Sequence, residues 1–291
     1  RRGEAAAELA AIERMIGGPA AAVASIEALG LDLRDPANEP ALRVFASDLV
    51  AMDRADRAIA SVDRALSSRP DSASLHALMG TTLARAYRSV DARSAFKRAL
   101  AIDPDQPEAL GGMAALAGAA GDTERAVELF DRAAAFDPSN SVYAYAAAQL
   151  LLAAGNRDAA KARLEAIVRQ SAAHVGARND LAWLLASEAG DLDLALALAR
   201  EASRLGPEPA TLDTLGFVHL ARGEYERAAE ALERAIAMPG SSPSAHYHLA
   251  LALNRSGDTA RARELLQRAL AAGDFPEAEA ARGLLANLDP P

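Results

Sequence analysis

The sequence contains no cysteine, few aromatic residues and almost no lysine. The absence of cysteine excludes disulfide bonds, thiolate chemistry and cysteine-ligated zinc. The 31 basic residues include two lysines, Lys97 and Lys161, and they form no basic stripe, so we expect no nucleic-acid partner held through phosphate contacts. No uncharged run reaches the ~18–20 continuous apolar residues of a membrane-spanning helix. We therefore expect no transmembrane segment in this chain.

Alanine and other apolar residues are abundant instead. Apolar residues make up 51% of the 291 positions, whereas aromatic residues make up 4%. Alanine, about a quarter of the chain, is the best helix former and its small side chain allows close contact between helices. Runs of β-branched residues with two-residue alternation are absent, so strands have little support. The composition predicts an all-helical protein with a net charge of −9.

Prolines and glycines recur with a fixed period of 34 residues. The prolines that share this spacing are Pro36, Pro70, Pro104 and Pro138. Two glycine pairs repeat the interval, and Gly190 stands between them: Gly121 with Gly155, and Gly223 with Gly257. A period of this size indicates one supersecondary unit copied along the chain, in a stacked array that usually functions through its surface.

The unit from Ala73 to Gln106 shows how each copy is built. Its sequence predicts one helix over residues 73–85 and a second over 91–102, with the Asp103-Pro104 pair stopping the chain because proline cannot continue a helix. Down the stack, positions 8, 20 and 27 of the unit are almost always alanine or glycine, and positions 7 and 24 carry larger apolar residues. The small residues indicate helix pairs that approach each other closely.

This pattern resembles the tetratricopeptide repeat (TPR) family, most closely from Leu215-Gly216 through Gly223-Glu224-Tyr225 to Ala235. The resemblance implies an all-α, right-handed α-solenoid of stacked helix-turn-helix units. Residues 1–38 are interpreted as a degenerate repeat or capping helices, and 277–291 as a C-terminal capping helix and tail. The terminal proline is missing at Ala172, and about one residue is added before Gly190. The seven expected units are 39–72, 73–106, 107–140, 141–174, 175–208, 209–242 and 243–276.

The sequence carries no recognisable catalytic or metal-binding motif. His246 and His248 are two residues apart, so on a helix they point in nearly opposite directions and cannot hold one ion. Ser94 and Lys97 spell the S-x-x-K string of penicillin-recognising enzymes, but they lie inside an ordinary second helix without the companion motifs. We therefore predict a protein that is not an enzyme and that needs no metal or cofactor.

The resemblance also implies where a partner binds, because first helices of such units line a concave groove. In the second and third units the residues at inward positions are small. Gly111, Gly112 and Gly118 are interpreted as residues that allow close approach of another backbone or make the helix pliant. Arg43 is the only basic candidate for the carboxylate clamp of chaperone receptors, so that clamp is not reproduced. From the fourth unit onward the inward residues are larger, and they form the predicted partner-binding set of Tyr145, Gln149, Asn179, Trp183, Asp213, Phe217, Tyr247, Asn254 and Arg255.

Alternatives remain for this set and for the whole chain. Trp183 and Phe217 also suit simple packing between neighbouring first helices. The stretches 179–186 and 213–217 resemble the C-terminal block of bacterial TPR proteins of exopolysaccharide-export and protein-sorting systems, which implies a cell-envelope scaffold, periplasmic rather than cytoplasmic. The leading hypothesis is a non-catalytic scaffold that binds a peptide or a partner's helix. The alternatives are a regulatory or targeting region of a longer enzyme, and a polysaccharide-binding wall of Tyr145, Trp183, Phe217 and Tyr247.

Overall fold

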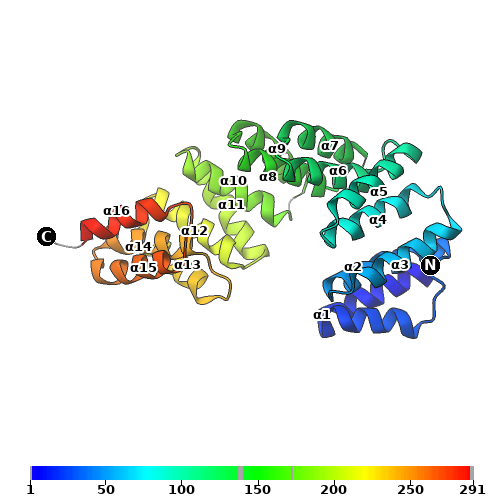
Figure 1. Cartoon of the computed structure of the whole chain (residues 1–291). Helices are drawn as coiled ribbons and strands as arrows, with labels where there is room; N and C mark the ends of the chain where they lie inside the picture. The colour runs from blue at the N-terminus through cyan, green and yellow to red at the C-terminus, as the bar shows by residue number, and fades with distance from the viewer. Residues whose placement is uncertain (1, 137–139, 172, 289–291) are drawn as a thin grey trace. The chain divides into compact units, whose positions relative to one another are not determined.

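The chain folds into two compact groups of helices, residues 1–154 and 155–291 (Figure 1). The computed structural model describes residues 2–136, 140–171 and 173–288, so the predictions at Pro138 and Ala172 lie outside the described residues. Within these ranges every regular element is a helix, which confirms the all-α class. From here on, the first unit means residues 1–154, the second unit means residues 155–291, and each 34-residue copy is called a repeat. The first unit contains α1 (Arg2–Ala28), the 3-10 turn η1 (Pro36–Asn38), α2 (Glu39–Ala51), α3 (Ala55–Ser68), α4 (Ala73–Arg85), α5 (Ser89–Ile102), α6 (Pro107–Ala119), α7 (Thr123–Phe136) and α8 (Val142–Ala153).

The second unit begins just before α9 and continues the alternation of first and second helices. The described elements follow the 34-residue period, and within each unit successive helices pack against each other as antiparallel hairpins (Figure 1). The helices of this unit are α9 (Arg157–Gln170), α10 (Val175–Ser187), α11 (Leu192–Leu205), α12 (Pro209–Ala221), α13 (Tyr225–Ala237), α14 (Pro243–Ser256), α15 (Thr259–Ala271) and α16 (Ala278–Leu288).

A left-handed residue ends the turn after each first helix from α2 to α14. It stands at position 15 of each of the seven repeats, whether or not that residue is glycine. Three of these residues are not glycine, and their backbone is strained because a Cβ disfavours the left-handed conformation. Their φ angles are 59° at Asp53, 59° at Tyr87 and 49° at Ala189. In the fifth repeat, residues 175–208, the left-handed residue is Ala189. Gly190 is the extra residue that precedes the N-cap Asp191. The conformation of the turn is therefore more regular than its sequence.

Glycines inside the helices make room for aromatic rings and leucines. A Cβ added at Gly80 of α4 or at Gly112 of α6 would overlap the ring of Phe96, which α5 supplies and which is 1% exposed. The ring thus fills the space between two successive first helices. The ring of Tyr143, on α8, fills the space beside Gly111 in the same way. The glycines of α6 let neighbouring side chains pack directly against the helix backbone. This packing explains why α6 contains glycines although each one weakens a helix.

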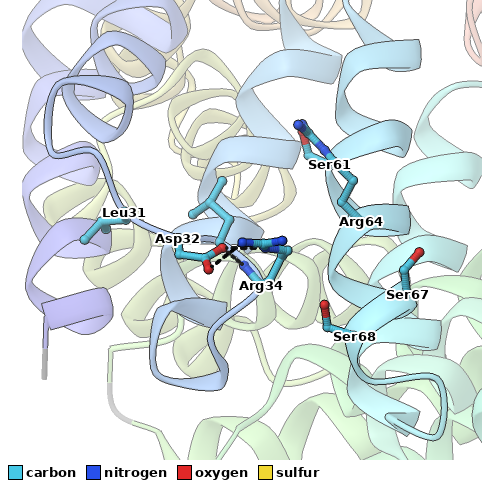
Figure 2. A pocket seen from close by; sticks show the side chains of 8 residues that line it. Leu31, Asp32, Arg34, Ser61, Arg64, Ser67 and Ser68 are labelled. Carbon is cyan, nitrogen blue, oxygen red and sulfur yellow. Dashed lines mark hydrogen bonds and ion pairs between the residues drawn. The ribbon is translucent and has the colours of Figure 1, made fainter.

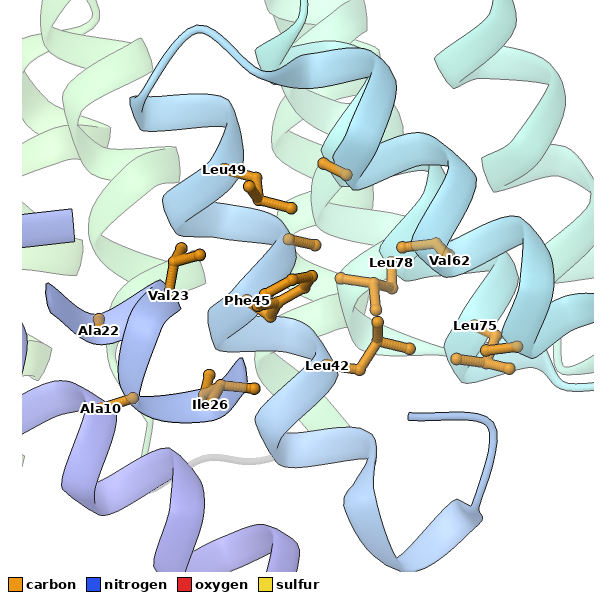
Figure 3. Packing of buried hydrophobic residues seen from close by; sticks show 13 residues of the cluster. Ala10, Ala22, Val23, Ile26, Leu42, Phe45, Leu49, Val62, Leu75 and Leu78 are labelled. Carbon is orange, nitrogen blue, oxygen red and sulfur yellow. The ribbon is translucent and has the colours of Figure 1, made fainter. Parts of the chain in front are cut away.

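The N-terminal helix is packed against α2 on one side and exposed on the other. Gly18 has φ 74° and ψ −171°, which breaks α1 just before Pro19. Apolar residues from both halves of α1 pack around Phe45 and its neighbours on α2 (Figure 3). By length and composition alone α1 is apolar enough to cross a membrane, which the sequence analysis did not anticipate, although the break divides it. Its outer face includes Met15, 88% exposed, and Ile16, 79% exposed.

The C-terminal helix α16 covers the end of the second unit. It packs against the core formed by α13, α14 and α15, together with Phe275, which is 9% exposed. Three leucines of α16 are partly buried against this core: Leu284, Leu285 and Leu288. The helix begins at Ala278, within the segment expected to form a C-terminal capping helix.

Candidate functional site

Five of the predicted residues lie on the inward positions of neighbouring first helices in the second unit. The helices α10 and α12 contact each other directly, and so do α12 and α14. Because one 34-residue period separates these helices, positions 5 and 9 of each repeat recur along their shared face. We call this face the second-unit groove, and its predicted residues are Asn179, Trp183, Asp213, Phe217 and Tyr247, all of them partly exposed.

The Asp213 carboxylate is held within the protein by a histidine that the sequence analysis did not select. Nδ1 of His248 lies 2.7 Å from a carboxylate oxygen of Asp213, and the histidine is only 5% exposed. An ionised carboxylate can only accept, so Nδ1 carries the proton of this hydrogen bond. The pair joins α12 to α14 across the groove wall. Asp213 therefore orients the imidazole rather than standing free for a partner.

Aromatic rings continue from this pair along the groove. The ring of His248 lies 5.0 Å from that of Phe217 and 5.7 Å from that of Tyr247, measured between centroids. Tyr247 in turn lies 6.4 Å from Phe275, a tilted arrangement that aromatic pairs favour. Burial, together with nearby Glu277, raises the pKa of Tyr247, so its hydroxyl stays protonated. Phe217 and Tyr247 thus pack partly inside the protein and keep part of each ring exposed.

Trp183 and Asn179 occupy α10, the first of the three helices. The guanidinium of Arg157, on α9, lies 5.5 Å from the centroid of the Trp183 ring, which suits a cation–π contact. Arg157 also forms a 3.9 Å ion pair with Glu188, so it is anchored next to the ring. The amide oxygen of Asn179 is buried and has no hydrogen-bond partner among the described residues. Such an atom costs free energy unless a ligand or water satisfies it.

The remaining predicted residues lie outside this row. Asn254 and Arg255 are near the end of α14, where Asn254 is partly exposed and Arg255 exposed. Tyr145 and Gln149 belong to α8 of the first unit; Tyr145 is partly exposed and Gln149 exposed. The structure thus brings five of the nine candidates onto one continuous face, with Asn254 and Arg255 at the end of one of its helices.

A second polar site lies in the first unit, and the sequence analysis missed most of it. Arg43 of α2 forms ion pairs with Glu39, at 3.3 Å, and with Glu108 of α6, at 2.5 Å. Burial would lower the pKa of Arg43, but the two carboxylates outweigh it and raise this pKa. The group borders a cavity of about 150 Å³ that Thr81 and Arg85 of α4 also line. The charge of Arg43 is therefore already balanced, in agreement with the absence of a carboxylate clamp.

Buried histidines have carboxylate partners, not metal-ligand neighbours. His219, 5% exposed, lies 2.7 Å from Glu224, which also binds Arg222 and Arg227. These arginines and the histidine lower the pKa of Glu224 to about 2. In the part of the chain that the structure describes, no three histidine, aspartate or glutamate side chains gather in a way that could hold a metal ion.

Comparisons with solved structures show the fold. A chain of the APC/C hetero-tetramer Cut9–Hcn1 superposes with a TM-score of 0.70 over 92% of this chain at 18% identity, and this chain spans only 52% of it. A tetratricopeptide repeat protein from Parabacteroides merdae gives a TM-score of 0.58 at 18% identity, over 85% of this chain and 97% of its own. YrrB, a TPR protein with an unusual peptide-binding site, gives 0.52 at 20% identity, over 63% and 95% respectively.

Sequence comparison identifies the family. None of the curated proteins matches the chain. One tetratricopeptide repeat model matches residues 43–107, 145–208 and 214–275, and a second matches 83–150. These matches cover more than half of the chain and coincide with the helix hairpins described above. The chain belongs to the tetratricopeptide repeat family, and its fold is the helical solenoid of that family.

Proposed function

We propose that this chain is a non-catalytic scaffold that binds a peptide or a partner's helix in the second-unit groove. The observation that carries the proposal is the row of partly exposed rings on three adjacent first helices, Trp183, Phe217 and Tyr247. Rigid aromatic side chains with one exposed face supply large contact area at low entropic cost, as in the centres of protein interfaces.

The peptide-binding part of this proposal is supported by its fixed geometry. The Asp213–His248 hydrogen bond and the Arg157–Trp183 contact hold side chains of the groove before a partner arrives. A preorganised groove loses less side-chain entropy on binding. YrrB is described as a TPR protein with a peptide-binding site, and its likeness to this chain in fold is consistent with such a role.

The test uses peptides selected against the whole chain. A library of extended peptides displayed on phage is panned against the wild-type protein, and the affinity of a synthetic winner is then measured by calorimetry. We expect Trp183→Ala and Phe217→Ala each to weaken binding by about tenfold or more, the loss typical of an interface hot spot. Leu194→Ala, at an exposed apolar position of the second helix α11, is the matched control and should leave affinity unchanged.

Thermal unfolding followed by circular dichroism establishes that each variant is folded. Folded Trp183→Ala and Phe217→Ala proteins with wild-type affinity would place binding elsewhere. Saturable binding of a polysaccharide, with no peptide selected, would favour the glycan-binding alternative.

We further propose that the scaffold acts in a bacterial cell-envelope or exopolysaccharide-export assembly. The support for this context is the resemblance of residues 179–186 and 213–217 to TPR proteins of those systems. A fusion of the full gene product to a reporter that is active only in the periplasm tests the compartment. Signal from the fusion in intact cells is the expected result, and activity of a cytoplasmic reporter alone would exclude it.

A further inference from the structure

A polar cavity of about 470 Å³ lies in the first unit between the segment before η1 and the helix α3 (Figure 2). Leu31, Asp32, Leu33 and Arg34 form one wall. The other wall consists of α3 side chains that share one helix face, Ser61, Arg64, Ser67 and Ser68. The volume falls within the range of small-molecule sites, but two guanidinium groups and three hydroxyls make this cavity unusually polar. It involves none of the residues of the second-unit groove.

The two arginines of the cavity differ in what holds them. The Asp32 carboxylate accepts from the Nε of Arg34, at 2.9 Å, and from one of its terminal nitrogens, at 3.0 Å (Figure 2). This fork leaves the other terminal nitrogen of Arg34 without a partner among the described residues. Arg64 hydrogen-bonds only within α3, to the Ala60 carbonyl oxygen and to Ser61 Oγ, each at 3.2 Å.

Arg57 on α3 and Arg69, the C-cap residue of this helix, both have acidic partners. Arg57 pairs with Glu27, and Arg69 pairs with Glu39 at 2.9 Å. In the described part of the chain, no carboxylate lies within ion-pair distance of Arg64. Its neighbour Asp63 projects from a different side of α3, since successive helical residues point about 100° apart. Arg64 is thus a cation that faces a cavity without a counter-ion.

The repeat explains why Arg64 has no acid. Two repeats further along the chain, the residue equivalent to Arg64 is Arg132 of α7. Arg132 donates to Asp105 at 3.2 Å and to the Pro104 carbonyl oxygen at 3.0 Å. The residue that corresponds to Asp105 in the loop before α2 is Ala37. The acid that satisfies this arginine position in α7 is therefore replaced by a methyl group opposite Arg64.

We propose that this cavity binds a small phosphoryl oxyanion, either a free phosphate or a phosphate monoester. Guanidinium groups present planar N–H donors that match phosphate oxygens, and serine hydroxyls donate further hydrogen bonds. Arg64 supplies the unbalanced charge, and the free nitrogen of Arg34 supplies a second donor on the opposite wall. The Ser68 hydroxyl lies on the α3 wall near the last turn and donates to a remaining oxygen, whereas the hydroxyls of Ser61 and Ser67 already donate to carbonyl oxygens of their own helix. Leu31 and Leu33 provide the apolar part of the wall for that substituent.

The experiment titrates the whole chain with inorganic phosphate and with phosphoserine, and serine is the uncharged reference. Binding is followed by amide chemical shifts in two-dimensional NMR spectra. We expect saturable shifts at residues 31–35 and 61–68 for both phosphate probes and none for serine. Tighter binding of phosphoserine than of inorganic phosphate would identify a monoester as the natural ligand, and the reverse order would identify free phosphate.

Three variants decide the role of the arginines. Arg64→Gln should weaken phosphate binding by about tenfold, the loss of one charge-assisted contact. Arg98→Gln is the matched control, because Arg98 is an exposed residue one repeat further, on α5, and it lines none of the cavities described above. Asp32→Asn should tighten binding severalfold, because it removes the carboxylate that competes for Arg34.

Several results would overturn the proposal. They are the absence of saturable shifts with both probes, equal loss in Arg64→Gln and Arg98→Gln, and weaker binding in a folded Asp32→Asn protein.

Discussion

Asp213 and His248 are separated by one repeat and one further residue in the sequence, and their side chains meet at 2.7 Å between α12 and α14. The side chain of His248 is 6% exposed and that of Asp213 is 17% exposed. The hydrogen bond therefore lies largely out of water, and it fixes the spacing of two first helices. Removing either partner leaves the other with a buried, unsatisfied group.

The first prediction concerns this pair. We expect His248→Ala to lower the free energy of unfolding by about 1–3 kcal/mol, because the Asp213 carboxylate loses its partner and Phe217 loses a ring contact. Urea unfolding of His248→Ala, Asp213→Ala and the double variant measures the coupling directly. Strictly additive losses would show that the two side chains do not stabilise each other.

The second prediction concerns the glycines that accommodate Phe96. Gly112→Ala should destabilise the protein by about 1–3 kcal/mol despite the better helix propensity of alanine, because its Cβ would overlap the Phe96 ring. Gly283→Ala in α16 is the matched control: nothing lies near its added Cβ, so we expect stabilisation of about 0.5–1 kcal/mol. Thermal unfolding compares the two variants. A stabilising Gly112→Ala substitution would contradict the packing described for α5 and α6.

The third prediction uses the left-handed residue at position 15. Ala189→Gly should raise stability by about 0.5–1 kcal/mol, because glycine adopts the left-handed conformation without steric cost. Gly223→Ala is the reciprocal change at a φ of 75°, and it should lower stability by about 1 kcal/mol. Guanidinium unfolding of both variants gives the two values. Equal signs for the two substitutions would argue against a common turn.

The fourth prediction concerns acid stability. Hydrogen bonds from Arg222 and His219 depress the pKa of Glu224 to about 2 in the folded protein, from an ordinary value of 4.5. A depressed carboxylate pKa contributes stability above its unfolded value, and that contribution is lost as the pH falls from about 4.5 toward 2. We therefore expect Glu224→Gln to lose less stability than the wild type across this window.

His219 adds to the same trend at higher pH. Burial lowers its pKa below the ordinary 6.5. The unfolded chain therefore binds this proton more readily, and stability decreases as the pH falls below about 6.5. Urea unfolding of the wild type and Glu224→Gln at a series of pH values separates the two groups. Parallel stability curves for both proteins between pH 4.5 and 2 would contradict the role of Glu224.

The regular parts of the fold could be predicted because they repeat. The recurring proline after second helices and the alanines at contact positions predicted a helix over residues 73–85, and these are the observed limits of α4. The left-handed Ala189 was not predictable, since alanine gives no sign of that conformation and the glycine beside it drew attention instead. In physical terms, the turn geometry is imposed by the packing of the flanking helices, which the identity of one residue does not reveal.

The places of the candidate residues on the first helices could be predicted from the sequence, but the contacts that hold them could not. The resemblance to the repeat family implied the inward positions of Asn179, Trp183 and Phe217, and helix periodicity then places such positions on one face. His248 stands one position beyond an inward site and was therefore not selected. Its contact with Asp213 depends on side-chain direction between two helices, and the sequence of either helix alone carries no signal for it. The same limitation hid Glu108 as a partner of Arg43.

The ion pairs of Arg43 give the first unit a mechanical property. Arg43 joins α2 to α6, two repeats away, and also donates to Ser74 of α4 at 2.6 Å. A pulling force along the stack would have to break these charged bonds together before the helices could separate. The tension needed to stretch α2 to α6 should accordingly fall when salt screens the charges.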